Sequence, residues 1–162
     1  MKTVLTVAGS DPSGGAGIQA DIKTITAHGL YATSAITALT VQNTLGVSRV
    51  EPVPVDLVAQ QIDCVVGDIR PDAVKIGMLC NAEIVQAVAQ ALAHGQAECI
   101  VIDPVMISTS GHRLLDQEAV QWMKRKLFPM AQLITPNLPE AEALCGMRVR
   151  DEAEMERAAR LL

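Results

Sequence analysis

Short apolar runs rich in β-branched residues alternate along the chain with segments in which apolar side chains recur every three or four positions. The runs predict strands, and the longer spacing predicts helices with one apolar face. The expected strands are Thr3–Ala8, Ala32–Thr40, Ala73–Ile76, Cys99–Asp103 and Gln132–Thr135. Their apolar residues are nearly continuous, which is typical of parallel strands covered on both faces. The sequence therefore predicts an α/β fold, with an open, mostly parallel sheet and helices on both of its faces.

The helices between these strands carry their own start and stop signals. Asn81 is expected to cap a helix that ends at Gly95, and Asp116 a helix that Pro129 stops. Asp151, followed three residues later by a glutamate, opens a last helix. The sequence stops inside that helix, where a βα unit ordinarily continues to another strand. Residues 1–162 are therefore expected to be the N-terminal portion of a single domain.

Composition and charge narrow the possible partners. Aromatic residues make up 2% of the chain and the net charge is −5, with Lys and Arg scattered, which argues against nucleic acid and anionic membrane as partners. A small anionic substrate stays possible, because a site makes its own local potential. No apolar run approaches the ~18 residues of a membrane span, and the N-terminal run is too short for a signal peptide. We expect a soluble, cytoplasmic protein.

The cysteines carry no recognisable chemistry. Cys64, Cys80, Cys99 and Cys145 form no C-x-x-C motif, and the three histidines add no metal-ligand spacing. Buried free thiols in a reducing compartment are favoured over zinc or disulfides.

Polar, glycine and proline residues gather where the predicted strands end, the edge at which open parallel sheets bind ligands. The loop after the first strand contains G-x-G-x-x-A from Gly15, but no acid lies between Asp21 and Glu51 to hold a dinucleotide ribose. No G-K-[ST] follows, so the loop is not a Walker A sequence. Two interpretations stay open: a flexible loop whose free N–H groups approach a ligand, or a glycine-rich turn needed only for its geometry.

Five further side chains near strand ends each have a structural and a functional interpretation. Asn137 and Glu140 have the spacing of a capping box, although a carboxylate there can also hold hydrated Mg²⁺ beside a phosphate. Asp103 caps the next segment or joins Glu140 at a metal–phosphate site. The amide of Gln42 suits the donor–acceptor edge of an aminopyrimidine, or it bonds only to backbone. Met78 packs on a flat ring or fills the core.

Five blocks occur in order along the chain: AGSDPSGGAGIQADIKT, ITALTVQNT, VKIGML, DPVM with the following SGHRLL, and ITPNLPEAEAL. Together, from Val4 to about Glu142, they resemble the hydroxymethylpyrimidine (phosphate) kinases of thiamine biosynthesis. Five ordered blocks are far more specific than any one of them. The resemblance implies the ribokinase-like version of the predicted fold.

The same resemblance implies an activity and a set of site residues. A kinase of this family transfers the γ-phosphoryl group of ATP, with Mg²⁺, to 4-amino-5-hydroxymethyl-2-methylpyrimidine and then to its monophosphate. Catalysis of this kind rests on positioning and charge neutralisation. The positions that match the pyrimidine pocket are Gly9, Asp21, Gln42, Met78 and Val105. The positions that match the part facing Mg²⁺ and the ATP phosphates are Asp103, Asn137 and Glu140, with Asp103 and Glu140 as the metal-facing acids.

One feature of the family is missing from the sequence. Family members are longer and carry a second glycine-rich segment, G-[ST]-G-[CD], which forms an anion hole and bears the activating residue. No such segment occurs here, so no catalytic residue is assigned, and it is expected beyond Leu162. The isolated chain is expected to be inactive, and the family suggests a homodimer. A non-catalytic pyrimidine-binding fragment and a pyridoxal kinase-like enzyme stay open as alternatives.

Overall fold

The computed structural model describes residues 1–106 and 115–162 and builds them around a five-stranded sheet. Its strands are β1 (Thr3–Ala8), β2 (Tyr31–Ile36), β5 (Ala73–Ile76), β6 (Ile100–Ile102) and β7 (Ala131–Ile134). Their order across the sheet is β2-β1-β5-β6-β7, and every neighbouring pair is parallel. The predicted parallel sheet is confirmed. Because β2 lies on one side of β1 and the later strands on the other, the topological switch point falls between β1 and β5.

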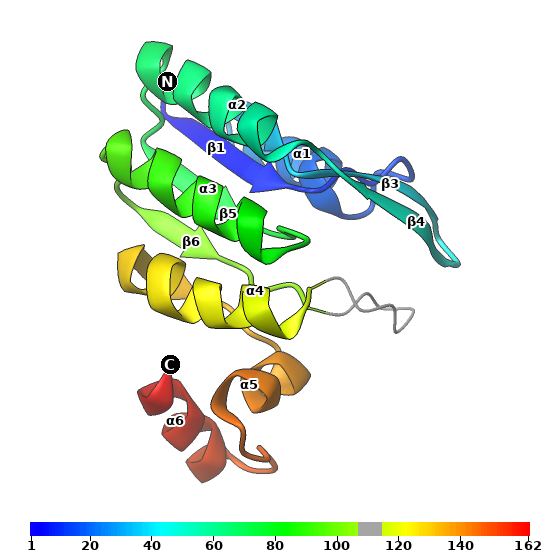
Figure 1. Ribbon diagram of the computed structural model, residues 1–162, viewed down its shortest axis with the longest axis vertical. Coiled ribbons are helices and arrows are strands. Elements are labelled where there is room, and N and C mark those ends of the chain that lie inside the picture. Colours follow the sequence, from blue (N-terminus) through cyan, green and yellow to red (C-terminus); the bar gives the residue numbers. More distant parts are fainter. Residues whose placement is uncertain (107–114) are drawn as a thin grey trace.

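Helices cover both faces of this sheet, as the sequence predicts. The row over one face contains α2 (Val55–Asp68), α3 (Ala82–His94) and α4 (Gln117–Trp122), whereas α1 (Gly17–Ala27) lies on the other face (Figure 1). After β7 the chain forms α5 (Leu138–Cys145) and α6 (Glu152–Leu161), which pack against each other at one end of the molecule (Figure 1). None of the helices in the described part of the chain has the length and apolarity needed to cross a bilayer.

The apolar core lies between the sheet and the α2–α3 layer. The largest side chains that are fully buried there include Leu5, Ile62, Ile76, Ile84, Leu92 and Ile102. Burying a side chain of this size stabilises the fold by roughly 1.5–3 kcal/mol. The core therefore holds β1, β5 and β6 in register, and with them the loops that leave their carboxyl ends.

The predicted strand Ala32–Thr40 is wrong as a single element. The chain forms β2 up to Ile36 and then β3 (Ala38–Asn43), which leaves the sheet and pairs antiparallel with β4 (Gly46–Pro52). Thr37 marks the break: its N–H donates to the Ala8 carbonyl oxygen at 3.0 Å, and its hydroxyl donates to that of Met78 at 2.6 Å. These bonds fix Thr37 at the edge of the sheet, so the strand beyond it projects from the body as a hairpin (Figure 1).

The predicted helix caps are confirmed. Asn81 accepts a hydrogen bond from the Ile84 N–H at the start of α3, with Gly95 as its C-cap, and Asp116 and Asp151 accept in the same way at α4 and α6. Pro129 lies in a 3-10 turn, Phe128–Met130, that follows a π-helical turn after α4 and leads into β7.

The expectation that all the thiols are buried is wrong. All four cysteines are free, but Cys64 and Cys99 are exposed, and Cys80 and Cys145 are half-buried. Cys64 lies on the outer side of α2, and Cys99 precedes β6 with a positive φ of 53°. Burial raises the pKa of the Cys80 thiol to about 11, so this thiol stays protonated at neutral pH.

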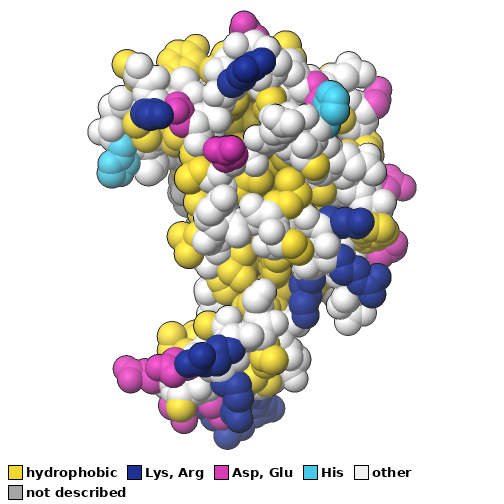
Figure 2. Space-filling model, turned by 90° about the vertical axis from the view of Figure 1, so that its left-hand side faces the viewer, with side chains coloured by type: hydrophobic (Ala, Val, Ile, Leu, Met, Phe, Trp, Pro, Cys, Tyr) yellow, Lys and Arg dark blue, Asp and Glu magenta, His cyan; other side chains and the backbone are white. Residues whose placement is uncertain are grey.

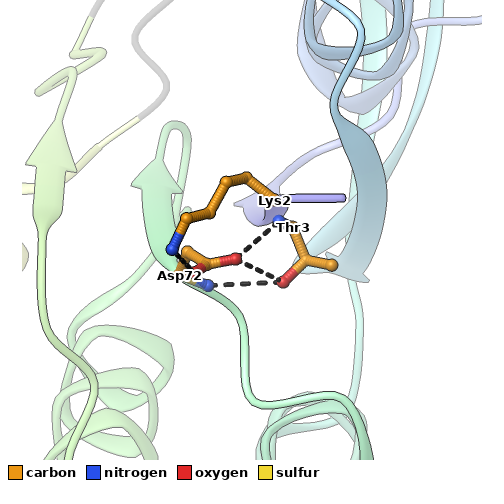
Figure 3. Close-up of polar contacts among 3 residues, drawn as sticks. All are labelled: Lys2, Thr3 and Asp72. Carbon is orange, nitrogen blue, oxygen red and sulfur yellow. Dashed lines mark hydrogen bonds and ion pairs between the residues drawn. The ribbon is translucent and has the colours of Figure 1, made fainter.

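Asp72, just before β5, ties the start of β5 to the start of β1 (Figure 3). Its carboxylate accepts from the Thr3 N–H at 2.8 Å and pairs with the Lys2 ammonium, while its own N–H donates to the Thr3 carbonyl at 2.9 Å. Hydrogen bonding from Lys2 and then from the Thr3 N–H lowers the pKa of Asp72 from 3.8 to about 2.

Replacing Asp72 with Asn should give a pH-dependent loss of stability. The folded pKa is depressed, so the carboxylate stabilises the fold above the ordinary value of 3.8 and loses that effect as pH falls through about 2. Denaturant unfolding of the wild type and of Asp72→Asn should be measured between pH 7 and pH 2. The difference between their free energies of unfolding should shrink only as the pH falls from 3.8 toward about 2. Lys2→Met should move the shrinkage to higher pH, because the carboxyl loses its strongest partner. A difference that is constant down to pH 2 would contradict this assignment.

Candidate active site

A cavity of about 300 Å³ opens at the carboxyl ends of β1 and β5, at the topological switch point of the sheet. Its wall comes from the loops after β1, β5 and β6 and from the inner face of the β3–β4 hairpin. Six of the sequence-predicted site residues line it: Gly9, Asp21, Gln42, Met78, Asp103 and Val105. Segments nearly a hundred residues apart in the chain therefore meet at the edge where parallel sheets bind ligands.

A wider hollow, of about 560 Å³, lies at the opposite, amino-terminal edge of the sheet, between the ends of α2 and α3. Figure 2 views the molecule from this side, where hydrophobic side chains run down the middle with charged ones around them. Its lining includes Arg70, Pro71 and His94, and none of the predicted site residues. The smaller cavity is the better candidate, because it lies at the switch point and gathers side chains from several strand ends.

The glycine-rich loop is held by the side chain of Asp11, which is 2% exposed. The two carboxylate oxygens accept from the N–H groups of Ser13, Gly15 and Ala16 at 2.8–3.0 Å and from the Ser13 hydroxyl at 2.7 Å. Burial opposes ionisation, but these hydrogen bonds prevail and lower the pKa of Asp11. The N–H groups of Ser13, Gly15 and Ala16 therefore bind Asp11 and are not free for a ligand. For this part of the loop, the interpretation as a glycine-rich turn with a fixed geometry is the better one.

Gly17 explains why the loop needs glycine where α1 begins. Its φ is +58°, and a Cβ at this position would lie 2.4 Å from the Gly9 carbonyl oxygen. The Ile18 N–H donates to that same carbonyl at 3.0 Å. Close approach of two backbone segments fixes where Gly9 borders the cavity.

Asp21 extends from α1 toward the sheet, where two side chains hold it. The Thr6 hydroxyl donates to its Oδ2 at 2.6 Å, and the Lys75 ammonium lies 3.0 Å from both carboxylate oxygens. Thr6 is fully buried in β1, and Lys75 projects from β5. Neither Thr6 nor Lys75 is among the site residues predicted from the sequence. A lysine inside the otherwise apolar strand Ala73–Ile76 was the available signal, because a half-buried ammonium needs a negative partner.

Gln42 and Met78 form the part of the cavity nearest the hairpin. Gln42 is half-buried in β3, and its Oε1 lies 3.5 Å from the Thr40 hydroxyl, a contact at the limit of a hydrogen bond. Within the described part of the chain, no hydrogen bond joins this side chain to the backbone. The Met78 methyl lies beside Gly9, where a Cβ would come within 2.3 Å of it. A thioether can pack on the face of a planar ring, and an amide can hydrogen-bond to its edge.

Asn137 and Glu140 form the predicted capping box at the start of α5 and do not line the cavity. The Asn137 side chain accepts from the Glu140 N–H, and Glu140 Oε2 accepts from the Asn137 N–H, both at 2.9 Å. Burial raises the pKa of Glu140, backbone N–H groups of Asn137 and Met106 lower it, and the charge of Asp103 raises it further. Glu140 and Asp103 are therefore electrostatic neighbours across the β6–β7 edge.

Asp103 connects this acidic region to the cavity. It follows β6, and burial raises its pKa, whereas the positive charge of Lys75 lowers it and the charge of Asp21 raises it. In the described ranges no group of three or more acidic, histidine or cysteine side chains could hold a metal. Two carboxylates are still a suitable donor set for Mg²⁺, which keeps most of its waters and is completed by substrate phosphates. The residues present thus fit a metal–phosphate site.

Most of the SGHRLL segment lies outside the described residues. Residues 110–114 of the SGHRLL segment fall in the range 107–114, which the structure does not describe.

The fold and the cavity define an α/β protein with a small cavity, lined in part by acids, at the switch point of a parallel sheet, which is where such sheets ordinarily bind ligands. A family model described as phosphomethylpyrimidine kinase matches residues 11–162, and the chain belongs to this family.

Individual relatives agree with the family match. The hydroxymethylpyrimidine/phosphomethylpyrimidine kinase of Haemophilus influenzae is 49% identical over 162 residues, which are 100% of this chain and 60% of that protein. The crystal structure of phosphomethylpyrimidine kinase from Clostridium difficile superposes with a TM-score of 0.91 at 45% identity, covering 99% of this chain and 71% of that one. The structure of pyridoxal kinase from Staphylococcus aureus in complex with AMP-PCP superposes with a TM-score of 0.87 at 36% identity. The match covers 99% of this chain and 58% of that one. The chain thus spans about three fifths of the length of the Haemophilus relative.

Proposed function

We propose that the protein to which this chain belongs phosphorylates 4-amino-5-hydroxymethyl-2-methylpyrimidine, and then its monophosphate, in thiamine biosynthesis. The observation that carries the proposal is the convergence of Gly9, Asp21, Gln42, Met78 and Val105 on one cavity. These are the five positions that the resemblance to the family assigns to the pyrimidine pocket. Family membership over residues 11–162 supports the same substrate class.

In the proposed reaction the hydroxymethyl oxygen of the pyrimidine attacks the γ-phosphorus of ATP. A new P–O bond forms, the bond from the γ-phosphorus to the β–γ bridging oxygen breaks, ADP leaves, and the hydroxyl proton passes to solvent or a base. No residue of this chain is assigned as that base. Gln42 and Met78 orient the ring and so place the hydroxymethyl group, which supplies much of the catalysis in phosphoryl transfer.

Asp103 and Glu140 are the proposed holders of Mg²⁺, with Asn137 fixing Glu140 through the capping box. Bound Mg²⁺ supplies positive charge that neutralises the phosphate oxygens. Nucleotide binding by a structural neighbour at 36% identity, seen with AMP-PCP, supports ATP as the donor. The four free cysteines fit the reducing cytoplasm that we propose as its location. A homodimer is the proposed assembly.

Turnover with three acceptors tests the substrate assignment. The protein at its full natural length should phosphorylate the hydroxymethylpyrimidine and its monophosphate with ATP and Mg²⁺, with kcat/KM above that for pyridoxal. The relative order is the informative result, because pyridoxal also has a flat ring and a hydroxymethyl group. A higher kcat/KM for pyridoxal would replace the proposal with a pyridoxal kinase, and pyrimidine binding without turnover of any acceptor would favour a non-catalytic module.

A further inference from the structure

Lys75 places a positive charge at the floor of the cavity. It is the one polar residue of β5, and its side chain is 28% exposed. Its ammonium reaches the cavity beside Gly77, where a Cβ would lie 3.0 Å from the Lys75 nitrogen. A side chain at position 77 would push the Lys75 ammonium aside, so glycine at this position leaves room for the ammonium at the cavity.

The other charged side chains that line the cavity are carboxylates. They are Asp11, Asp21 and Asp103, so among the described residues Lys75 is the one cation on this surface. Asp11 is occupied by the glycine-rich loop, whereas Asp21 and Asp103 face the same region as Lys75. Lys75 is therefore the group on this surface that can attract an anionic ligand, because Coulomb energies between unit charges a few ångströms apart reach several kcal/mol near a protein surface.

The contacts of Lys75 leave it able to bind a ligand. An ammonium has three N–H donors, and within the described part of the chain its polar contacts are with the two oxygens of Asp21. At least one donor therefore stays available for a ligand oxygen. The pyrimidine alcohol is neutral and gains little from a nearby ammonium. Its monophosphate carries a charged group on the hydroxymethyl oxygen, and this group can accept a charge-assisted hydrogen bond from Lys75.

We propose that Lys75 is the specificity-determining residue that lets this one cavity accept the phosphorylated pyrimidine as well as the neutral alcohol. The inference rests on the proposed function and deepens it, because it assigns the second of the two substrates to a particular side chain. Asp21 is the positioning residue for Lys75, held in turn by Thr6.

Lys75→Met tests the inference through a ratio of two substrates. Loss of a charge-assisted hydrogen bond should raise KM for the monophosphate by about 10- to 100-fold relative to the change for the alcohol. Lys75→Arg keeps the charge and should keep the ratio near that of the wild type. Lys23→Met is the matched control: Lys23 is exposed on α1 and its ammonium donates to the Gly14 carbonyl at 2.8 Å, so the ratio should not change.

A double variant guards against a folding defect. Lys75→Met leaves the half-buried Asp21 carboxylate with Thr6 but without a positive partner. Lys75→Met with Asp21→Asn removes both charges and should recover stability without recovering binding of the monophosphate. Equal losses for both substrates, or no loss for either, would overturn the inference while leaving the proposed function intact. If the wild type turns over neither substrate, the proposed function fails. Calorimetric titration of the two ligands into wild type and Lys75→Met then decides the inference, by whether the variant selectively loses the monophosphate.

Discussion

Replacing Glu140 with glutamine should lower kcat, or the affinity for Mg²⁺, by about 100-fold while leaving the melting temperature close to that of the wild type. The two effects separate because the amide oxygen of glutamine can still accept from the Asn137 N–H that Glu140 bonds at 2.9 Å. The charge is what the metal requires. Burial already raises the pKa of Glu140, so a neutral group at this position costs the fold little.

Steady-state kinetics over a range of Mg²⁺ concentrations, together with thermal unfolding, measure both effects. Glu154→Gln is the matched control, because Glu154 accepts from the Arg150 N–H at 2.7 Å at the start of α6, far from the cavity. It should leave kcat unchanged. Normal turnover by Glu140→Gln with a lowered melting temperature would show that Glu140 is a cap and nothing more.

Replacing Gln42 with alanine should raise KM for the hydroxymethylpyrimidine by about 30- to 150-fold, since two hydrogen bonds at a half-buried site are worth roughly 2–3 kcal/mol. KM for ATP should change little, because Gln42 belongs to β3 of the hairpin, whereas the acids proposed to face Mg²⁺ and the ATP phosphates follow β6 and begin α5. Stability should hardly change, since among the described residues the polar contact of this side chain is a single weak one, with the Thr40 hydroxyl at 3.5 Å.

Gln61→Ala is the informative companion to Gln42→Ala. The amide of Gln61 bonds both backbone groups of Ile36, at 2.9 and 3.1 Å, so it is a glutamine with a backbone role. Its loss should lower stability and leave KM for the pyrimidine unchanged. An unchanged pyrimidine KM in Gln42→Ala would remove Gln42 from the substrate site.

The sequence predicted those parts of the fold that depend on local chemistry. The runs at Thr3–Ala8 and Ala73–Ile76 became strands at the predicted bounds, because buried parallel strands are apolar throughout. Asn81, Asp116 and Asn137 capped helices as predicted, because an N-cap needs only its own side chain and the next turn. Strand ends then located most of the candidate site, because chain direction alone brings the ends of parallel strands to one edge.

Features that depend on partners distant in the chain could not be predicted from local sequence patterns. The β3–β4 hairpin was missed because its first strand continues the apolar run of β2, and the break between them depends on bonds to distant residues, such as those of Thr37 to Ala8 and Met78. The glycine-rich loop is a different case, because the sequence left two interpretations open and the deciding partner is local: Asp11 accepts from N–H groups two, four and five positions later. Lys75 was missed because the carboxylate that it binds, Asp21, lies 54 positions earlier in the sequence.

A crystal structure of the protein soaked with 4-amino-5-hydroxymethyl-2-methylpyrimidine tests the central claim most directly, because the claim concerns where this molecule binds. We predict the ring in the cavity at the switch point of the sheet, packed against Met78, with its amino edge on the Gln42 amide and its hydroxymethyl group toward Lys75 and Asp103. Density for the pyrimidine in the hollow between α2 and α3, or none in the cavity at saturating ligand, would contradict the account.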